Sequence, residues 1–250
     1  MEEEDRSVKP ELQAELRTFC VQACHGKSKG SFRTQTSAVM NRFPGAMAAD
    51  LSETDLWHKV KAMPYVACEK SDGTRYLLAA LGDRGVFLIS REWEMSPWRL
   101  ILKGRDGKLL DDTLLDGELV TDTEGDPDGI LTELPVLRFL VFDAMRIGGR
   151  DLTCLNLLKR LETCAAEVFK PRIDFLRECA EKKAKPKEDM DIFMKDFFDL
   201  RDVSVVIGLS KQKRLPHPCD GVILTPVLWP YTPGSCPQLL KWKPPEMNTV

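Results

Sequence analysis

Lys70-Ser71-Asp72-Gly73-Thr74-Arg75 is the stretch that decides the fold of this chain, and two segments far downstream complete it. These are Asp220-Gly221-Val222-Ile223 and Leu240-Lys241-Trp242-Lys243-Pro244. Together the segments supply a primary amine, carboxylates and cations of the kind that hold phosphate groups. The set therefore indicates chemistry on phosphate.

The order of further segments strengthens this interpretation. A Lys-x-Asp-Gly-x-Arg match alone arises by chance in roughly one chain in a few hundred of this size. Between Arg75 and Asp220, however, lie Arg91 in Ile-Ser-Arg-Glu, Asp116-Gly117-Glu118-Leu119-Val120 and Arg138-Phe139-Leu140-Val141-Phe142-Asp143. In this order the segments resemble those of the covalent nucleotidyltransferase superfamily, and specifically the GTP:RNA guanylyltransferase domain of eukaryotic mRNA capping enzymes. The resemblance runs from about Phe43 to Val250.

Length, charge and cysteine content are those of an ordinary intracellular domain. The 250 residues can bury the core of one large domain, and no run approaches the ~18 apolar residues of a membrane span. A net charge of -3 excludes a broad basic surface, so any RNA contact must be local. The eight cysteines are too dilute for a disulfide scaffold, which predicts reduced thiols in the cytosol or nucleus. The acidic start, Met1-Glu2-Glu3-Glu4-Asp5, is the reverse of a signal peptide.

The first half of the chain combines short helices with a series of strands. Pro10 and the helical spacing of Leu12, Leu16 and Phe19 predict a helix over residues 10–25, followed by a loop to residue 45. Ser52-Glu53-Thr54-Asp55 is a capping-box pattern that predicts a short helix. Short apolar runs bounded by Gly and Asp then predict strands at residues 65–68, 76–81, 86–89, 114–120 and 137–142.

The second half begins with helix and returns to strands. Residues 155–169 have helical spacing, Pro171 is expected to end or kink this helix, and a second helical stretch runs to Cys179. Strands are predicted at residues 203–209, 222–225 and 239–242. The regular spacing of short strands favours antiparallel pairing. We therefore expect an α+β fold with antiparallel sheets that flank a nucleotide cleft and with peripheral helices, which is also what the resemblance implies.

The whole chain, residues 1–250, is interpreted as one nucleotidyltransferase domain in which residues 1–42 form an N-terminal helix and loop. In the family, the closing strand, which corresponds to the segment of Lys241 and Lys243, is followed by an OB-fold lid that carries further basic residues. Because the chain stops soon after that strand, we expect the OB-fold lid to be missing from it. Without the lid, the chain is expected to bind GTP better than it forms a covalent adduct.

Lys70 is the predicted nucleophile. A lysine amine attacks phosphorus only when it is neutral, and an ordinary lysine, with a pKa near ~10.4, is almost entirely protonated at neutral pH. Nearby cations favour the neutral amine, and Arg75, Lys241 and Lys243 are the candidates to supply them while they also hold the phosphates. The resemblance implies that Lys70 attacks the α-phosphate of GTP, expels pyrophosphate and holds GMP as a phosphoamide. The alternative is an exposed lysine at a strand end.

Phosphoryl transfer also calls for a metal ion that offsets the charge on the transferring group. Oxygen ligands suit Mg²⁺ or Mn²⁺. By resemblance, Glu118 in Asp-Gly-Glu-Leu-Val and Asp220 in Asp-Gly-Val-Ile-Leu occupy the acidic positions of the family. The alternative is that each Asp-Gly pair is an ordinary turn with a solvated carboxylate.

Selection of the base requires an apolar slot and contacts to the edge of the base, because stacking alone tolerates any base. The resemblance implies that Phe139 stacks on one face of guanine and that Ile223 covers the other. It also implies that Lys195 donates to guanine O6 and that Arg91 lies near the ribose. A lone phenylalanine in a strand is more often a core residue. The stacking role of Phe139 is therefore based mainly on the match of the Arg-Phe-Leu-Val-Phe-Asp segment to the family.

Other activities share these motifs. ATP-dependent polynucleotide ligases use the same lysine chemistry. Three segments favour capping over ligation: Phe43-Pro44-Gly45-Ala46, Glu69-Lys70 and Leu240-Lys241-Trp242-Lys243-Pro244-Pro245. After Gly45 the family commonly has Ala/Ser-Gln-Pro-Val-Ser, whereas this chain has Ala46-Met47-Ala48-Ala49-Asp50. A weakly active homologue that serves as a binding module is a further alternative.

The resemblance also implies partners and a compartment. GMP would be transferred to the 5′-diphosphate end of an RNA. The chain has no His-Cys-x5-Arg phosphatase signature, so the RNA triphosphatase activity is expected to reside elsewhere. The phosphorylated tail of RNA polymerase II is a further expected partner, the expected location is the nucleus, and no membrane is involved.

Overall fold

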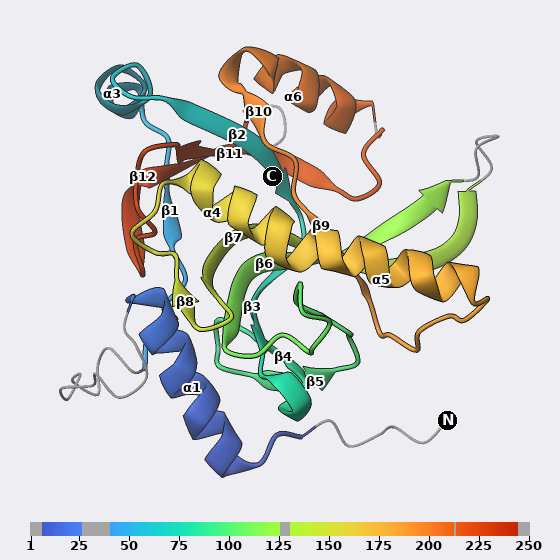
Figure 1. The fold of residues 1–250 in the computed structure, drawn as a ribbon. Helices are drawn as coiled ribbons and strands as arrows, with labels where there is room; N and C mark the ends of the chain where they lie inside the picture. Colours follow the sequence, from blue (N-terminus) through green and yellow to red (C-terminus); the bar gives the residue numbers. More distant parts are fainter. Residues whose placement is uncertain (1–6, 27–40, 126–130, 213, 245–250) are drawn as a thin grey trace.

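The computed structural model describes residues 7–26, 41–125, 131–212 and 214–244, and it is built on two β-sheets with helices around them (Figure 1). The strands are β1 Met47–Asp50, β2 Tyr65–Ser71, β3 Thr74–Ala80, β4 Val86–Ile89, β5 Met95–Trp98, β6 Thr113–Gly125, β7 Leu131–Ile147, β8 Arg150–Asp151, β9 Asp191–Met194, β10 Phe198–Asp199, β11 Cys219–Pro226 and β12 Ser235–Trp242. The α-helices are α1 Pro10–Cys24, α3 Glu53–Asp55, α4 Leu157–Cys164, α5 Lys170–Glu181 and α6 Val203–Lys211. The predicted α+β class is confirmed.

One sheet has five strands in the order β1-β12-β11-β2-β10. The pairs β12–β11, β11–β2 and β2–β10 are antiparallel, whereas β1 runs parallel to β12. The helix α6 covers this sheet (Figure 1): Val206 and Ile207 pack in one apolar cluster with Tyr65 and Leu240. The five-stranded sheet therefore joins an early strand to the last one.

The other sheet has the strand order β5-β4-β3-β6-β7-β8, with β9 paired in parallel to β7. Its strands are apolar on both faces because both faces are covered. Leu77 and Ala79 of β3 pack in one cluster with α1, whereas Leu78 and Ala80 pack in another cluster with Cys164 at the end of α4. Figure 1 shows α1 and the continuous α4–α5 helix as separate layers around this sheet.

Lys70-Ser71-Asp72-Gly73-Thr74-Arg75 connects the two sheets. Lys70 lies near the end of β2 in the five-stranded sheet, and Arg75 lies near the start of β3 in the seven-stranded sheet. The turn between them passes close to β6, where a Cβ atom on Gly73 would come within 2.5 Å of the Leu119 carbonyl oxygen. Only glycine allows the turn to come this close to β6, and the motif thereby links the two sheets.

Most predicted elements are confirmed, and three predictions need correction. Residues 203–209, predicted as a strand, form helix α6. Pairing is not wholly antiparallel, because β1 and β9 each lie parallel to a neighbour. Pro171 does not end the helix: α4 runs through a π-helical turn, Ala165–Phe169, directly into α5, with Pro171 in its first turn. Most of the predicted loop over residues 26–45 lies outside the described residues.

The predicted helix over residues 10–25 and the capping box are both present. α1 spans Pro10–Cys24, and the Ser52 and Asp55 side chains each accept from the other's backbone N–H. No helix within the described ranges is long and apolar enough to cross a membrane.

Candidate active site

A cavity of about 280 Å³ lies between the two sheets. Strands from both sheets contribute to its wall, and so do the segment before β1 and the turn between β9 and β10. The lining residues are Ala46, Met47, Ala48, Cys68, Lys70, Ser71, Asp72, Gly73, Arg75, Arg91, Asp116, Glu118, Phe142, Asp143, Lys195, Phe197, Ile223, Thr225, Tyr231, Leu239 and Lys241. The cavity has the size and mixed polarity of a small-molecule site.

Lys70 projects into this cavity beside a carboxylate. Its Nζ lies 2.7 Å from Oδ1 of Asp220, and Lys243 contacts the other oxygen of the same carboxylate. The side chains of Lys70 and Asp220 are each about three-quarters buried, at 24% and 22% exposure. Although burial opposes the charged carboxylate, the hydrogen bonds from Lys243 and Lys70 lower the pKa of Asp220. Asp220 therefore stays ionised and shares its charge between two ammonium groups.

Lys241 also lines the cavity, and its Nζ lies 3.3 Å from Asp50 Oδ1. Lys243 is exposed on one side and contacts Asp220 on the other. Lys241 lies near the end of β12, and Lys243 follows directly after the strand. The two predicted cations of the closing strand are thus brought to the neighbourhood of Lys70.

Arg75 lines the cavity, but its charge is compensated by a buried carboxylate that the motif does not contain. Its Nε donates to Asp116 Oδ1 at 2.9 Å, and its Nη2 donates to Asp116 Oδ2 at 2.6 Å. Burial disfavours the guanidinium, but Asp116 outweighs this effect and raises the pKa of Arg75. Arg75 therefore lies in the cavity wall as predicted, but its ion pair with Asp116 offsets the positive charge that it was expected to supply near Lys70.

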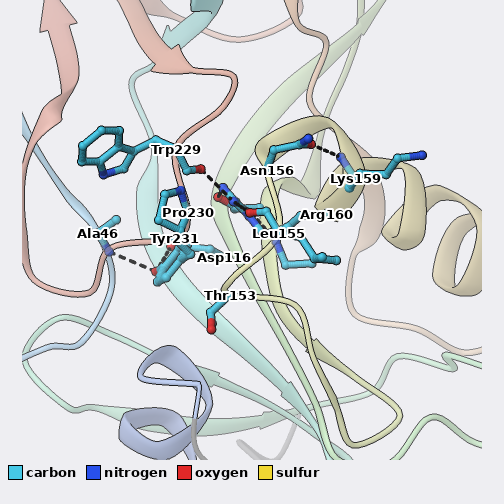
Figure 2. A network of polar contacts seen from close by, with 12 residues as sticks. Ala46, Asp116, Thr153, Leu155, Asn156, Lys159, Arg160, Trp229, Pro230 and Tyr231 are labelled. Carbon is cyan, nitrogen blue, oxygen red and sulfur yellow. Dashed lines mark hydrogen bonds and ion pairs between the residues drawn. The ribbon is translucent and has the colours of Figure 1, made fainter.

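The Asp116 carboxylate is fully buried and has a third donor. The hydroxyl of Tyr231 donates to Asp116 Oδ2 at 2.8 Å, and the same hydroxyl accepts from the Ala46 N–H at 3.0 Å (Figure 2). Arg75 Nη1 in turn donates to the Ala46 carbonyl at 2.5 Å. These contacts form a closed ring through Arg75, Asp116, Tyr231 and Ala46.

Lys195 lies at the back of the cavity between two carboxylates. Its Nζ is 3.3 Å from Glu118 Oε2 and 3.7 Å from Glu69 Oε1. Burial disfavours the ammonium, but Cys68, Glu69 and Glu118 outweigh it and raise the pKa of Lys195. The lysine is therefore a fixed, charged donor whose side chain is almost completely buried.

A second buried polar group lies behind Glu69. His217 Nδ1 is 2.8 Å from Asp122 Oδ1, and its Nε2 is 3.2 Å from the Ser71 hydroxyl and 3.6 Å from Glu69 Oε1. Arg138 Nη1 donates to the other oxygen of Asp122 at 2.5 Å. This chain of contacts supports the strand that carries Lys70.

Phe142 lines the cavity wall, whereas Phe139, which was predicted to stack on the base, does not. Phe139 is fully buried in the core of the seven-stranded sheet, whereas Phe142 lines the cavity. A Cβ atom on Gly117 would lie 2.5 Å from the Phe139 ring, so that ring packs over the glycine of the neighbouring strand. The structure thus contradicts the predicted position of Phe139, and its ring has no access to a ligand in the cavity.

The remaining predicted residues are distributed around the cavity. Ile223 of β11 lines it opposite the seven-stranded sheet, and the exposed Arg91 lines its rim. Glu118 lines the cavity next to Lys195. Asp220 is not among the lining residues, but it contacts Lys70, which is. The two Asp-Gly pairs, Asp116-Gly117 and Asp220-Gly221, lie within strands and are not turns.

Sequence reasoning missed Asp116, Phe142 and Tyr231. Asp116 and Phe142 lie inside segments that were singled out, and the alternation of β7 separates Phe142 from Phe139 and Val141. Strand alternation is thus the signal that could have found Phe142. Tyr231 lies in Trp229-Pro230-Tyr231, which has no local pattern that points to a site.

The carboxylates form no ready-made metal centre. Among the residues that the structure describes, no group of three or more His, Cys, Asp or Glu side chains could hold a metal ion. The two predicted ligands, Glu118 and Asp220, each contact lysine ammonium groups. A cation at this site would therefore depend on a ligand for further oxygen donors.

Comparison with known proteins places these residues in a family. The family model described as "mRNA capping enzyme, catalytic domain" matches residues 3–245. The mRNA-capping enzyme subunit alpha of Saccharomyces cerevisiae is 37% identical over 224 residues, which cover 83% of this chain and 47% of the relative. The mRNA-capping enzyme of Danio rerio is 29% identical over 215 residues, which cover 83% of this chain and 33% of the relative. The chain spans about half or less of the length of these relatives.

A solved structure shows the same fold at low identity. The ATP-dependent DNA ligase of bacteriophage T7, in complex with ATP, has a TM-score of 0.50 and 15% sequence identity. The similarity covers 81% of this chain and 69% of the ligase. The two-sheet architecture is thus shared with this ligase at the level of the fold.

Proposed function

The chain belongs to the mRNA capping enzyme catalytic-domain family, and we propose that it is a guanylyltransferase that forms the 5′ cap of mRNA. The observation that carries the proposal is the position of Lys70, which projects into the cavity between the sheets and contacts Asp220. In the proposed reaction Lys70 takes GMP from GTP and passes it to RNA.

The first step forms one bond and breaks another. The lone pair of Lys70 Nζ attacks the α-phosphorus of GTP, and the bond from that phosphorus to the oxygen bridging to the β-phosphate breaks. Pyrophosphate leaves with the bond electrons, and GMP remains joined to Lys70 through a phosphorus–nitrogen bond. In the second step an oxygen of the RNA 5′-diphosphate attacks the same phosphorus, and the amine of Lys70 is released.

The ammonium of Lys70 must lose a proton before it can attack. Asp220 is the acceptor in contact with it, at 2.7 Å. Lys243 contacts the same carboxylate, and a triphosphate that draws Lys243 and Lys241 toward itself would free Asp220 to take this proton. The neutral Arg75–Asp116 pair fixes the wall beside this step without adding net charge.

Lys195 and Phe142 support the choice of base. Lys195 is a donor held by Glu118 and Glu69, as a contact to the O6 acceptor of guanine requires. Phe142 and Ile223 line the cavity from different sheets and supply apolar faces. Arg91, at the rim of the cavity, is the residue that we propose to contact the ribose of the nucleotide.

A divalent cation, Mg²⁺ or Mn²⁺, fits the donor set. Mg²⁺ usually takes one or two protein carboxylates and completes its shell with phosphate oxygens and water. Asp220 and Glu118 would hold it, and when bound it would offset the charge of the transferring phosphate and the leaving pyrophosphate.

The test is incubation with GTP or ATP labelled on the α-phosphate, in the presence of Mg²⁺ or Mn²⁺, followed by denaturing electrophoresis. Label from GTP on the protein supports the proposal. Label from ATP alone would indicate a ligase-type adenylyltransferase, and no label from either nucleotide in the presence of a lid domain would indicate a binding module. Each of these two outcomes contradicts the proposal.

The surroundings of the reaction are part of the proposal. We propose that the acceptor is the 5′-diphosphate end of RNA, that a separate RNA triphosphatase prepares it, and that the protein works in the nucleus near the phosphorylated tail of RNA polymerase II. The assignment of residues 1–250 to one nucleotidyltransferase domain, completed by an OB-fold lid, also remains a prediction. Adduct formation with and without a lid domain tests that assignment.

A further inference from the structure

Tyr231 is a buried residue of the cavity wall for which the proposed reaction has no direct use. Its side chain belongs to the closed ring of contacts with Asp116, Ala46 and Arg75, and Figure 2 shows its hydroxyl between Ala46 and Asp116. Each partner in this ring also lines the cavity. The ring is therefore part of the surface that a nucleotide would meet.

The direction of each hydrogen bond in the ring is fixed. The Tyr231 hydroxyl donates to Asp116 Oδ2, which also accepts from Arg75 Nη2. The oxygen of that hydroxyl is then free to accept from the Ala46 N–H. No member of the ring can reverse its role, and such directed networks hold their members in one geometry.

The Ala46 peptide is held on both sides by this ring. Tyr231 accepts from its N–H at 3.0 Å, and Arg75 donates to its carbonyl at 2.5 Å. Ala46, Met47 and Ala48 form one wall of the cavity, and β1 continues this wall along β12 to Lys241. Tyr231 thereby links the position of the wall to the buried charge of Asp116.

Tyr231 is itself held firmly by the segment between β8 and α4. Its N–H donates to the Thr153 carbonyl at 2.9 Å. Two residues before it, the Trp229 carbonyl accepts from Arg160 Nη1 at 3.2 Å (Figure 2). Arg160 makes two further hydrogen bonds to Asp143. The tyrosine is therefore a rigid support and not an adaptable side chain.

We propose that Tyr231 is a positioning residue for nucleotide binding, which holds the Ala46–Ala48 wall and the Arg75 guanidinium in the geometry that receives GTP. The inference rests on the proposed function for the identity of the nucleotide. Tyr231 does not take part in the chemical step, because its hydroxyl is committed to Ala46 and Asp116.

Tyr65 provides a matched control within the same chain. Tyr65 and Tyr231 are about equally buried, with exposed fractions of 6% and 7%. The Tyr65 hydroxyl also makes a hydrogen bond, to the Gln238 carbonyl at 2.8 Å, but Tyr65 does not line the cavity. Loss of the Tyr65 hydroxyl removes one part-buried hydrogen bond, whereas loss of the Tyr231 hydroxyl removes two buried ones and releases the cavity wall.

The experiment compares the wild type, Tyr231→Phe and Tyr65→Phe. The dissociation constant for GTP is measured by titration, and adduct formation at saturating GTP is measured in a single turnover. For Tyr231→Phe we expect the dissociation constant to rise about tenfold, the factor that corresponds to ~1.4 kcal/mol. The rate at saturating GTP is expected to stay within about twofold of the wild type, and Tyr65→Phe is expected to match the wild type in both.

Two results would overturn the inference: an unchanged dissociation constant in Tyr231→Phe, or an equal loss of affinity in both variants, which would indicate a merely structural effect. If Tyr231→Phe does not fold, Asp116→Asn replaces it, since this change removes the charge to which Tyr231 donates. Wild-type affinity for GTP in Asp116→Asn would then overturn the inference. Wild-type protein that binds GTP without an adduct, even with a lid domain, would contradict the proposed function and leave the affinity comparison valid.

Discussion

Lys70 and Asp220 are 150 residues apart in the sequence, and their side chains meet at 2.7 Å in the cavity between the two sheets. Lys243 contacts the same carboxylate, so two ammonium groups share one negative charge. The carboxylate bridges the two lysines, and the positive charge of the two ammonium groups attracts a triphosphate. This arrangement supports Lys70 as the residue that carries GMP.

Replacement of Lys70 by alanine is expected to abolish the adduct with GMP, because no other amine takes its place beside the α-phosphate. The fold should be retained, since the Lys70 side chain is partly exposed and its ion pair contributes at most about 1 kcal/mol. Labelling with GTP and circular dichroism measure the two effects. Lys108→Ala, in an exposed lysine, is the control. An adduct of wild-type yield in Lys70→Ala would refute the assignment.

Phe142 and Phe139 allow a paired test of the stacking position. Phe142→Ala should weaken GTP binding by ~1 to 3 kcal/mol, which is the usual contribution of an aromatic ring to stacking on a base. Phe139→Ala should instead lower the free energy of unfolding by ~3 to 5 kcal/mol, because it leaves a cavity in the core. Titration with GTP and urea denaturation of both variants distinguish the roles. The assignment is wrong if Phe139→Ala weakens GTP binding more than Phe142→Ala does in folded protein.

Lys195 is expected to determine the preference for GTP over ATP. Lys195→Met keeps the length of the side chain but removes the donor, so the ratio of the two affinities should fall toward one. The same change leaves Glu69 and Glu118 without their common cation, and some loss of stability is expected. The readout is therefore the ratio of the GTP and ATP dissociation constants, which a general loss of stability does not change. Full retention of the preference would exclude the contact to guanine O6.

His217 predicts a dependence of stability on pH. Burial disfavours its charged form, but the hydrogen bonds to Glu69 and Asp122 outweigh this effect and raise the pKa of His217 above its ordinary value of 6.5. A raised pKa means that the folded protein binds this proton more tightly than the unfolded chain. The stabilisation is therefore fully present below the unfolded pKa and is lost as the pH rises through the folded pKa.

The measurement is urea denaturation of the wild type and of His217→Gln at about pH 6 and at about pH 9, a range that brackets the titration of histidine. The difference in the free energy of unfolding between the two proteins should be larger at the lower pH. Other titrating groups contribute about equally to both proteins, so the difference isolates His217. A difference that is the same at both pH values, or larger at the higher one, would contradict the prediction.

Local patterns were sufficient for most elements of the fold. The spacing of Leu12, Leu16 and Phe19 predicted α1, and the apolar run at residues 86–89 predicted β4 with the bounds that the structure shows. Residues 203–209 form a helix although their β-branched composition favours a strand. Val203, Val206 and Ile207 are spaced three and four apart, and this helical face packs on the five-stranded sheet.

Site residues that lie in a sequence motif could be predicted. Site residues whose role depends on a partner far away in the sequence could not. Lys70, Lys195 and Ile223 line the cavity as expected. Arg75 lines the cavity as well, but no local pattern shows that it pairs with Asp116, which lies 41 residues away on the neighbouring strand β6. No sequence pattern connects Tyr231 to Ala46, because 185 residues separate them.

The parallel pairing of β1 with β12 has a consequence for biosynthesis. β1 is synthesised long before its partner strand β12, which ends at Trp242. In the same way, β2 is synthesised long before its partner β11. Such distant contacts form late and slowly, because the loop that they close must first be complete. On the ribosome, the strand that carries Lys70 therefore emerges with an unpaired edge, which is a template for aggregation until the last strands arrive. The cavity that Lys70 lines is thus completed only after β11 and β12 have been made.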